Sequence, residues 1–215
     1  MTLTLHMYPT INAHKVTIAL AEMALPYEVA FVDITSPQHP VPAFLVLNPN
    51  GRMPVLTDSD TGVTVFESAA ILQYLGRKTG KFYPTDEVQR TRVESWLYWQ
   101  MSGQGPMFGQ VNWFTRAANN PERTPADTAF AIERFRKEAS RLIDVMERQL
   151  TGREYLCDEY TIADICAFPW LHRYHQNGGG LEGRPNVAAW NERIAARPVV
   201  AAAMNVGYDL LPPKE

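Results

Sequence analysis

The first third of the chain alternates between strand-like and helix-like patterns of apolar residues. Leu3, Leu5 and Met7 alternate with polar positions, which is the period of a short strand. The other elements expected here are a helix over 16–23, a strand over 27–33, a helical turn over 44–47, strands over 55–56 and 63–66, and a helix over 67–78. The predicted order is β-α-β-α-β-β-α. The crossover through a helix makes the first two strands parallel, and the short turn at 60–62 makes the last two antiparallel.

The rest of the chain shows helical spacing only. A helix is predicted from residue 86, with an interruption at Ser-Gly-Gln-Gly-Pro (102–106) that indicates a kink or a close approach. An amphipathic helix is predicted over 129–150. Thr161 and Asp164 have the spacing of a capping box, and the helix after them is apolar nearly all round, which predicts burial. We therefore expect an α/β domain over 1–81, a linker over 82–88 and an all-helical domain over 89–215.

Composition and charge exclude several classes of protein. The 215 residues are 46% hydrophobic and 20% charged, as in an ordinary globular chain. A net charge of −3 argues against a nucleic-acid binder, which would be basic. No apolar run approaches the roughly 20 residues that span a bilayer, and no leader pattern is visible. Cys157 and Cys166 have neither metal-ligand nor disulfide-framework spacing, so we expect no metal site and a cytoplasmic location.

The stretch 48–56 combines turn residues with a proline that opens a strand. Asn48-Pro-Asn-Gly is dense in turn formers, and Met53-Pro54 leads directly into Val55-Leu56. A proline has no N–H to give to a sheet, so it belongs at a strand start, and an X-Pro bond after a turn is where a cis peptide is tolerated. Such a bend would turn the backbone of Met53 outward, where it can pair with an extended peptide.

Glu67 and Ser68 stand where the second hairpin strand becomes a helix. A helix start offers free N–H groups and a partial positive charge, which suit a carboxylate. The carboxylate of Glu67 beside it could form an ion pair with an ammonium group. Taken alone, the same residues also fit a plain hairpin followed by a capped helix.

Asn48-Pro-Asn-Gly-Arg-Met-Pro-Val-Leu and Phe66-Glu-Ser-Ala-Ala-Ile-Leu-Gln-Tyr-Leu resemble the glutathione site of the glutathione S-transferase family. The resemblance extends over nearly the whole chain. It implies a thioredoxin-like N-terminal domain, a helical C-terminal domain, glutathione as cosubstrate and a homodimer. It also implies that Met53 and Pro54 pair with the cysteinyl part of glutathione, and that Glu67 and Ser68 hold its γ-glutamyl end.

The loop Pro9-Thr-Ile-Asn-Ala-His-Lys15 resembles the Pro-Thr-Pro-Asn-Gly-His-Lys loop of the bacterial Nu-class-like subgroup, several of whose members bind oxidised glutathione and reduce disulfides. This implies that Thr10 and Asn12 contact the sulfur. Ile11 and Ala13 depart from the subgroup pattern, which leaves open which of the two is the main donor.

The chain has no cysteine in its first third, so the thiol there must come from glutathione. A hydroxyl or amide that donates to sulfur favours the thiolate, and a helix start adds to this effect. Thr10 and Asn12 are also ordinary cap and turn residues. Tyr8 ranks second to them because it ends the first strand.

The resemblance implies further contacts. Gln38 or His39 would meet the glycyl end of glutathione, with help from Arg52, and the sequence does not decide between the first two. Arg134 would approach bound glutathione. The stretch 96–110 is also similar to the subgroup, whose corresponding helix lines the pocket for the second substrate. The aromatic residues there fit ordinary core positions as well.

Three functions remain in competition. The first is a transferase, in which glutathione thiolate attacks an apolar electrophile. The second is a glutathione-dependent disulfide oxidoreductase, which the Thr…Asn loop favours, whereas the family at large favours the first. The third is a ligand carrier without catalysis, because fold alone does not establish activity.

Overall fold

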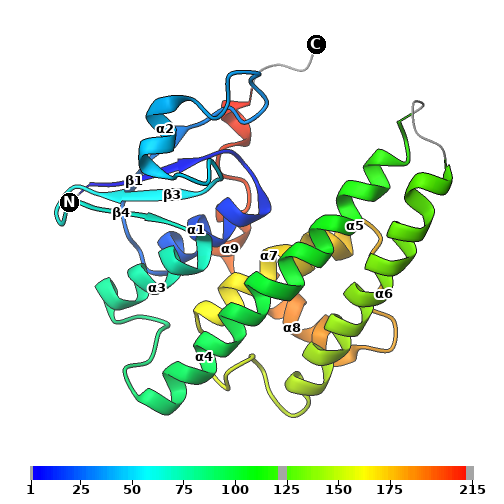
Figure 1. Cartoon of the computed structure of the whole chain (residues 1–215). Coiled ribbons are helices and arrows are strands. Elements are labelled where there is room, and N and C mark those ends of the chain that lie inside the picture. Colours follow the sequence, from blue (N-terminus) through cyan, green and yellow to red (C-terminus); the bar gives the residue numbers. More distant parts are fainter. Residues whose placement is uncertain (1, 121–124, 212–215) are drawn as a thin grey trace. The chain divides into compact units, whose positions relative to one another are not determined.

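The computed structural model describes residues 2–120 and 125–211 (Figure 1). Its strands are β1 (Leu3–Met7), β2 (Tyr27–Phe31), β3 (Val55–Asp58) and β4 (Val63–Phe66). Its helices are α1 (Ile11–Glu22), α2 (Pro42–Leu47), α3 (Ser68–Thr79), α4 (Glu87–Trp99), α5 (Gly105–Ala117), α6 (Pro125–Leu150), α7 (Ile162–Gln176), α8 (Pro185–Ala195) and α9 (Pro198–Ala203). Two short turns complete them, the π-helical η1 (Gln100–Gln104) and the 3₁₀ η2 (Tyr208–Leu210).

The chain divides into two compact units. The first comprises Met1–Glu87 together with the segment from Ile194 onward, and the second comprises Val88–Arg193. The sequence places that last segment in the helical domain instead. Within the described residues, no helix has both the length and the apolar character needed to cross a lipid bilayer.

The first unit is built on a four-stranded sheet with the order β2-β1-β3-β4. β1 pairs with β2 in parallel and with β3 antiparallel, so that Leu5 lies opposite both Val29 and Leu56. The β3–β4 pair is antiparallel. This confirms the predicted β-α-β-α-β-β-α order and the thioredoxin-like arrangement. The buried strand positions Leu3, Leu5 and Met7 form its core.

The strand β2 is shorter than predicted and ends at Phe31. The carboxylate of Asp33 accepts hydrogen bonds from the backbone N–H and the hydroxyl of Thr35, at 2.8 and 2.6 Å. An aspartate that bonds the backbone two residues on makes a turn. The chain therefore leaves the sheet before Asp33.

Helix α9 packs against α1 within the first unit. The hydroxyl of Thr17 donates to the carbonyl of Ala203 at 2.8 Å, and both groups are buried. The guanidinium of Arg197 forms a two-pronged ion pair with Glu22. These contacts tie the end of the described chain to its first helix.

The second unit is helical. The predicted interruption at 102–106 takes the form of the π-helical turn η1, which carries α4 directly into α5 without a loop. The helix after Thr161 is buried as predicted, and the capping box of Thr161 and Asp164 is present. Asp164 also accepts from the backbone N–H of Leu156 and from Trp190 Nε1, which the sequence did not indicate.

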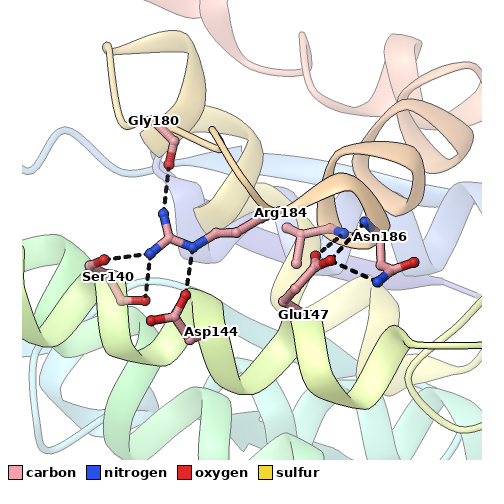
Figure 2. A network of polar contacts seen from close by, with 7 residues as sticks. Ser140, Asp144, Glu147, Gly180, Arg184 and Asn186 are labelled. Atoms are coloured by element: carbon pink, nitrogen blue, oxygen red, sulfur yellow. Dashed lines mark hydrogen bonds and ion pairs between the residues drawn. The ribbon is translucent and has the colours of Figure 1, made fainter.

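A network of polar contacts joins α6 to the start of α8 (Figure 2). Arg184 donates to Asp144 Oδ1 at 2.7 Å and to Ser140 Oγ at 2.5 Å. The carboxylate of Glu147 accepts from the backbone N–H groups of Asn186 and Val187, at 3.1 and 2.9 Å. A residue on α6 therefore satisfies the otherwise unpaired N–H groups in the first turn of α8.

Candidate functional site

A cavity of about 700 Å³ opens in the first unit. This volume lies within the range of small-molecule sites. The start of α1, the loops 34–40 and 48–54, and the junction of β4 with α3 supply its walls. Its lining residues are Thr10, Asn12, Ile34, His39, Pro40, Asn48, Asn50, Gly51, Arg52, Met53, Pro54, Glu67 and Ser68.

The Met53–Pro54 peptide bond is cis, in agreement with the expectation from sequence. The strand β3 begins at the next residue, Val55, which pairs with His6 and Phe66. Among the described residues, the backbone N–H and C=O of Met53 have no hydrogen-bond partner. Met53 lines the cavity, and an unpaired backbone segment at this position would suit an extended peptide.

Asn48 shapes the loop that precedes the cis peptide. Its side chain is buried, accepts a hydrogen bond from the backbone N–H of Asn50 at 2.9 Å and donates to the carbonyl of Arg52 at 2.7 Å. Gly51 lies between them with φ +64°, and a Cβ there would come within 3.0 Å of Pro40. Only glycine meets both conditions without strain, so the two cavity loops approach closely at this point.

The junction of β4 and α3 holds Glu67 in an unusual backbone conformation. Its φ is 71° and its ψ is 119°, although it is not glycine. Such strain at a non-glycine residue is typical of ligand-binding sites. Glu67 is exposed at the cavity wall, and Ser68 begins α3 as a buried residue. The N–H groups in the first turn of α3 therefore lie beside the Ser68 hydroxyl and the Glu67 carboxylate. Both of these residues line the cavity.

Lys15 contacts the cavity wall from behind, a position that the sequence did not predict. It lies on α1 and is 1% exposed, and its Nζ donates to Ser68 Oγ at 3.3 Å. The sequence signal was its position directly before Val16, on a helix whose apolar residues predict a buried face. A lysine is rarely buried there unless it has a partner.

Thr10 is the N-cap of α1. Its Oγ1 accepts a hydrogen bond from the backbone N–H of Ala13 at 3.3 Å. A hydroxyl that accepts one bond still has its own proton to donate. The capping role and a contact with a ligand atom in the cavity are therefore compatible. Asn12 lies in the first turn of the same helix and also lines the cavity.

His39 and Gln38 differ in placement. His39 lines the cavity, and its Nε2 lies 3.2 Å from the carbonyl oxygen of Gly51. A carbonyl only accepts, so Nε2 carries the proton in this bond. The His39–Pro40 bond is also cis, which the sequence analysis did not anticipate. Gln38 is exposed and is not part of the cavity lining.

The cavity thus brings together most of the site residues expected from sequence: Thr10, Asn12, His39, Arg52, Met53, Pro54, Glu67 and Ser68. Arg134 instead lies on α6 in the second unit, in a groove of about 490 Å³. Tyr8 packs its ring against Phe31, with centroids 5.5 Å apart, and is not among the lining residues.

Neither cysteine belongs to the unit that holds the cavity. Cys157 and Cys166 are buried in the second unit, and neither is in a disulfide. Burial raises the pKa of the Cys157 thiol to about 12. At neutral pH it is therefore protonated and a poor nucleophile, so any thiolate in the cavity must come from a ligand.

Comparison with known proteins agrees with these features. Residues 1–77 match the model of the glutathione S-transferase N-terminal domain, and residues 129–193 match that of the C-terminal domain. The chain is 38% identical to the disulfide-bond oxidoreductase YfcG of Escherichia coli over 206 residues, which cover 93% of each protein.

Solved structures show the same fold. A glutathione transferase of Burkholderia graminis, crystallised with two glutathione molecules per subunit, has a TM-score of 0.87 at 36% identity, over 96% of this chain and 89% of that one. A glutathione transferase of Pseudomonas putida, crystallised with one glutathione disulfide per subunit, has a TM-score of 0.86 at 34% identity, over 95% and 91%. With a thioredoxin-like sheet, a cis-proline loop, a helical second unit and these relatives, the chain belongs to the glutathione S-transferase family.

Proposed function

We propose that the cavity of the first unit binds glutathione. The open backbone of Met53 would pair with the cysteinyl residue of the ligand by strand addition. The γ-glutamyl carboxylate would lie at the start of α3 with Ser68, and the γ-glutamyl ammonium would face Glu67. His39 lies on the loop 34–40 and Arg52 on the loop 48–54, and both would bind the glycyl carboxylate.

In this pose the sulfur points toward the start of α1. The hydroxyl of Thr10 and the amide of Asn12 would donate to it, and the helix dipole would add a partial positive charge. Both effects favour the thiolate and lower its pKa. The protein then acts by electrostatic stabilisation, and the nucleophile is the ligand itself.

The reaction that follows is transfer of glutathione to an electrophile. The thiolate sulfur forms a bond to an electrophilic carbon, the leaving group departs with its electron pair, and the thiol proton goes to solvent. We infer that the electrophile is apolar, because the stretch 96–110, which resembles the helix that lines the second-substrate pocket in the Nu-class-like subgroup, is rich in aromatic residues.

A single observation carries the proposal. The cis-proline edge, the start of α3 and the start of α1 meet in one cavity, in a unit whose sequence contains no cysteine. A backbone edge that suits a cysteinyl peptide, in a unit without a protein thiol, fits an enzyme that takes its reactive thiol from glutathione.

Disulfide reduction is the second candidate. It is favoured by the similarity to the Escherichia coli disulfide-bond oxidoreductase and to the Pseudomonas putida protein that holds glutathione disulfide. One glutathione thiolate would attack a substrate disulfide, forming a mixed disulfide and releasing one thiolate. A second glutathione would attack the mixed disulfide, giving glutathione disulfide and the second reduced thiol.

Two assays separate these functions. Isothermal calorimetry with reduced and oxidised glutathione tests binding, and turnover of a model aryl halide is compared with reduction of hydroxyethyl disulfide. Activity on the aryl halide alone supports transfer, and activity on the disulfide alone supports reduction. Heat of binding without turnover of either indicates a ligand carrier. No heat with either redox form contradicts the proposal as a whole.

We also propose a homodimer in the cytoplasm. The dimer is supported by the family to which the chain belongs, and the location by two cysteines that form no disulfide and by the need for reduced glutathione. Light scattering gives the mass in solution, and a value near the chain's own 24.3 kDa would contradict the dimer. Cell fractionation tests the location.

A further inference from the structure

The buried side-chain amine of Lys15 lies directly behind the wall of the cavity. Lys15 is 1% exposed and stands within a stretch of α1, Ala13 to Leu20, in which every residue is buried. Its Nζ lies 3.3 Å from Ser68 Oγ, and Ser68 lines the cavity. One hydroxyl group therefore separates the buried amine of Lys15 from the ligand space.

The chemistry of this contact fixes the role of the serine. A lysine ammonium has three donors and no acceptor, so Ser68 Oγ is the acceptor in the pair. The hydroxyl proton of Ser68 cannot point at Lys15 and must be directed elsewhere. A carboxylate at the start of α3 would receive that O–H together with the backbone N–H groups of the helix. The positive charge of Lys15 polarises the hydroxyl and strengthens it as a donor.

We propose that Lys15 is a positioning residue that selects the α-carboxylate of the γ-glutamyl group by acting through Ser68. This inference rests on the proposed function. Lys15 and the α-carboxylate do not touch. The lysine sets the orientation of the Ser68 hydroxyl and, in its protonated form, adds positive potential at the start of α3. Its effect belongs to binding and appears in KM rather than in kcat, because the carboxylate is the same in ground and transition states.

A purely structural role makes a different prediction. If Lys15 only joins α1 to α3, its loss lowers stability and weakens every ligand of the cavity to the same extent. If Lys15 acts on the α-carboxylate, its loss weakens only ligands that carry this group. The two roles are separated by an analogue of glutathione in which 4-aminobutanoyl replaces the γ-glutamyl residue, so that the α-carboxylate alone is missing.

The test measures Kd for glutathione and for this analogue by calorimetry, with the wild type and with Lys15→Met, Lys15→Gln and Lys15→Arg. We expect Lys15→Met to raise the Kd of glutathione about tenfold or more, the size of a lost charge-assisted hydrogen bond. The Kd of the analogue should change by less than about twofold. Lys15→Arg keeps the charge and should restore most of the affinity, and Lys15→Gln should lie between the two.

A double-mutant cycle tests the route through Ser68. If the lysine acts through the hydroxyl, Lys15→Met should have little further effect in a Ser68→Ala background. Lys81→Met is the matched control, because the Nζ of Lys81 donates to the carbonyl of Met23, the C-cap of the same helix, and Lys81 does not line the cavity. It should leave both Kd values unchanged.

The outcomes are distinct. Equal weakening of both ligands by Lys15→Met, or additive effects in the cycle, overturns the role of Lys15 but leaves the proposed function intact. Failure of the wild type to bind glutathione overturns the proposed function itself. If Lys15→Met does not fold, the comparison of Lys15→Gln with Lys15→Arg still decides the question, because only the charge-bearing variant should retain selectivity for the carboxylate.

Discussion

The indole Nε1 of Trp190 donates a hydrogen bond to Oδ1 of Asp164 at 2.8 Å, and both residues are fully buried. The same carboxylate accepts from the backbone N–H groups of Leu156 and Thr161, at 2.9 and 3.0 Å. The sequence identifies Asp164 only as the acidic member of a capping box. In the structure its carboxylate accepts hydrogen bonds from three places: the loop before α7, the N-cap of α7, and helix α8.

Asp164→Ala should therefore cost more than the loss of a helix cap. A cap alone contributes about 1 kcal/mol, but this change also leaves the buried donors of Leu156 and Trp190 without an acceptor. We expect a loss of about 3 kcal/mol or more in the free energy of unfolding, measured by urea denaturation. Thr161→Ala removes the cap and one weak hydroxyl bond to Asp164, at 3.4 Å, but leaves the Asp164 carboxylate to its other donors, and should cost about 1 kcal/mol. Equal losses for the two variants would contradict this account.

Glu147 should stabilise the fold by more than an exposed charged residue does. Its carboxylate caps the first turn of α8 through Asn186 and Val187 (Figure 2). We expect Glu147→Ala to lower the free energy of unfolding by about 1–2 kcal/mol. The control is Glu138→Ala on the same helix, which breaks an exposed pair with Arg141 and should cost about 0.5 kcal/mol or less. Thermal unfolding of both variants compares the two, and a smaller loss for Glu147 would refute the capping role.

Asp58 should make the first unit sensitive to acid. Burial raises the pKa of its carboxyl, but hydrogen bonds from Lys78, Tyr74 and the backbone of Asp60 outweigh this and bring the pKa down to about 2. Since the folded pKa lies below the ordinary 3.8, ionised Asp58 stabilises the fold. This contribution is complete above about pH 4 and is lost as the pH falls toward 2.

The measurement is the free energy of unfolding as a function of pH. Asp58→Asn should lower it near neutral pH by about 1–2 kcal/mol and should flatten its decline below pH 4. Asp209→Asn, at an exposed residue of the same unit, controls for the loss of one negative charge. An unchanged acid limb in Asp58→Asn would show that other groups cause the decline.

Thr10 and Asn12 should control the pKa of bound glutathione. Removal of a donor near the sulfur weakens the thiolate, so Asn12→Ala and Thr10→Ala should each raise that pKa, by about 1 unit for a hydrogen bond of about 1.4 kcal/mol. The ultraviolet absorbance of the thiolate, followed against pH in the complex, measures it. Thr10→Ser keeps both the cap and the donor and should leave the pKa unchanged. If neither alanine variant moves the titration, other groups hold the sulfur.

Short local sequence patterns predict much of the fold. The cis Met53–Pro54 bond and the capping box of Thr161 depend on residues within a few positions of each other, and both were predicted. The apolar pattern predicts that β2 continues to Asp33, but the turn that Asp33 makes with Thr35 ends the strand at Phe31. The interruption expected at 102–106 is a π-helical turn over 100–104, followed by a close approach at Gly105, where a Cβ would lie 2.9 Å from the Gln100 side chain.

The sequence by itself determined the order of strands and helices, the family and most of the cavity lining, because periodicity, turn residues and short motifs are written in consecutive positions. Only the tertiary structure decided that Lys15 lies behind Ser68, 53 residues away, that Trp190 completes the shell of Asp164, 26 residues away, and that α9 returns to Thr17, which bonds a residue 186 positions along the chain. The reason is physical. A buried charge or donor finds its partner through space, and that partner is set by the packing of the whole unit rather than by any neighbouring residue.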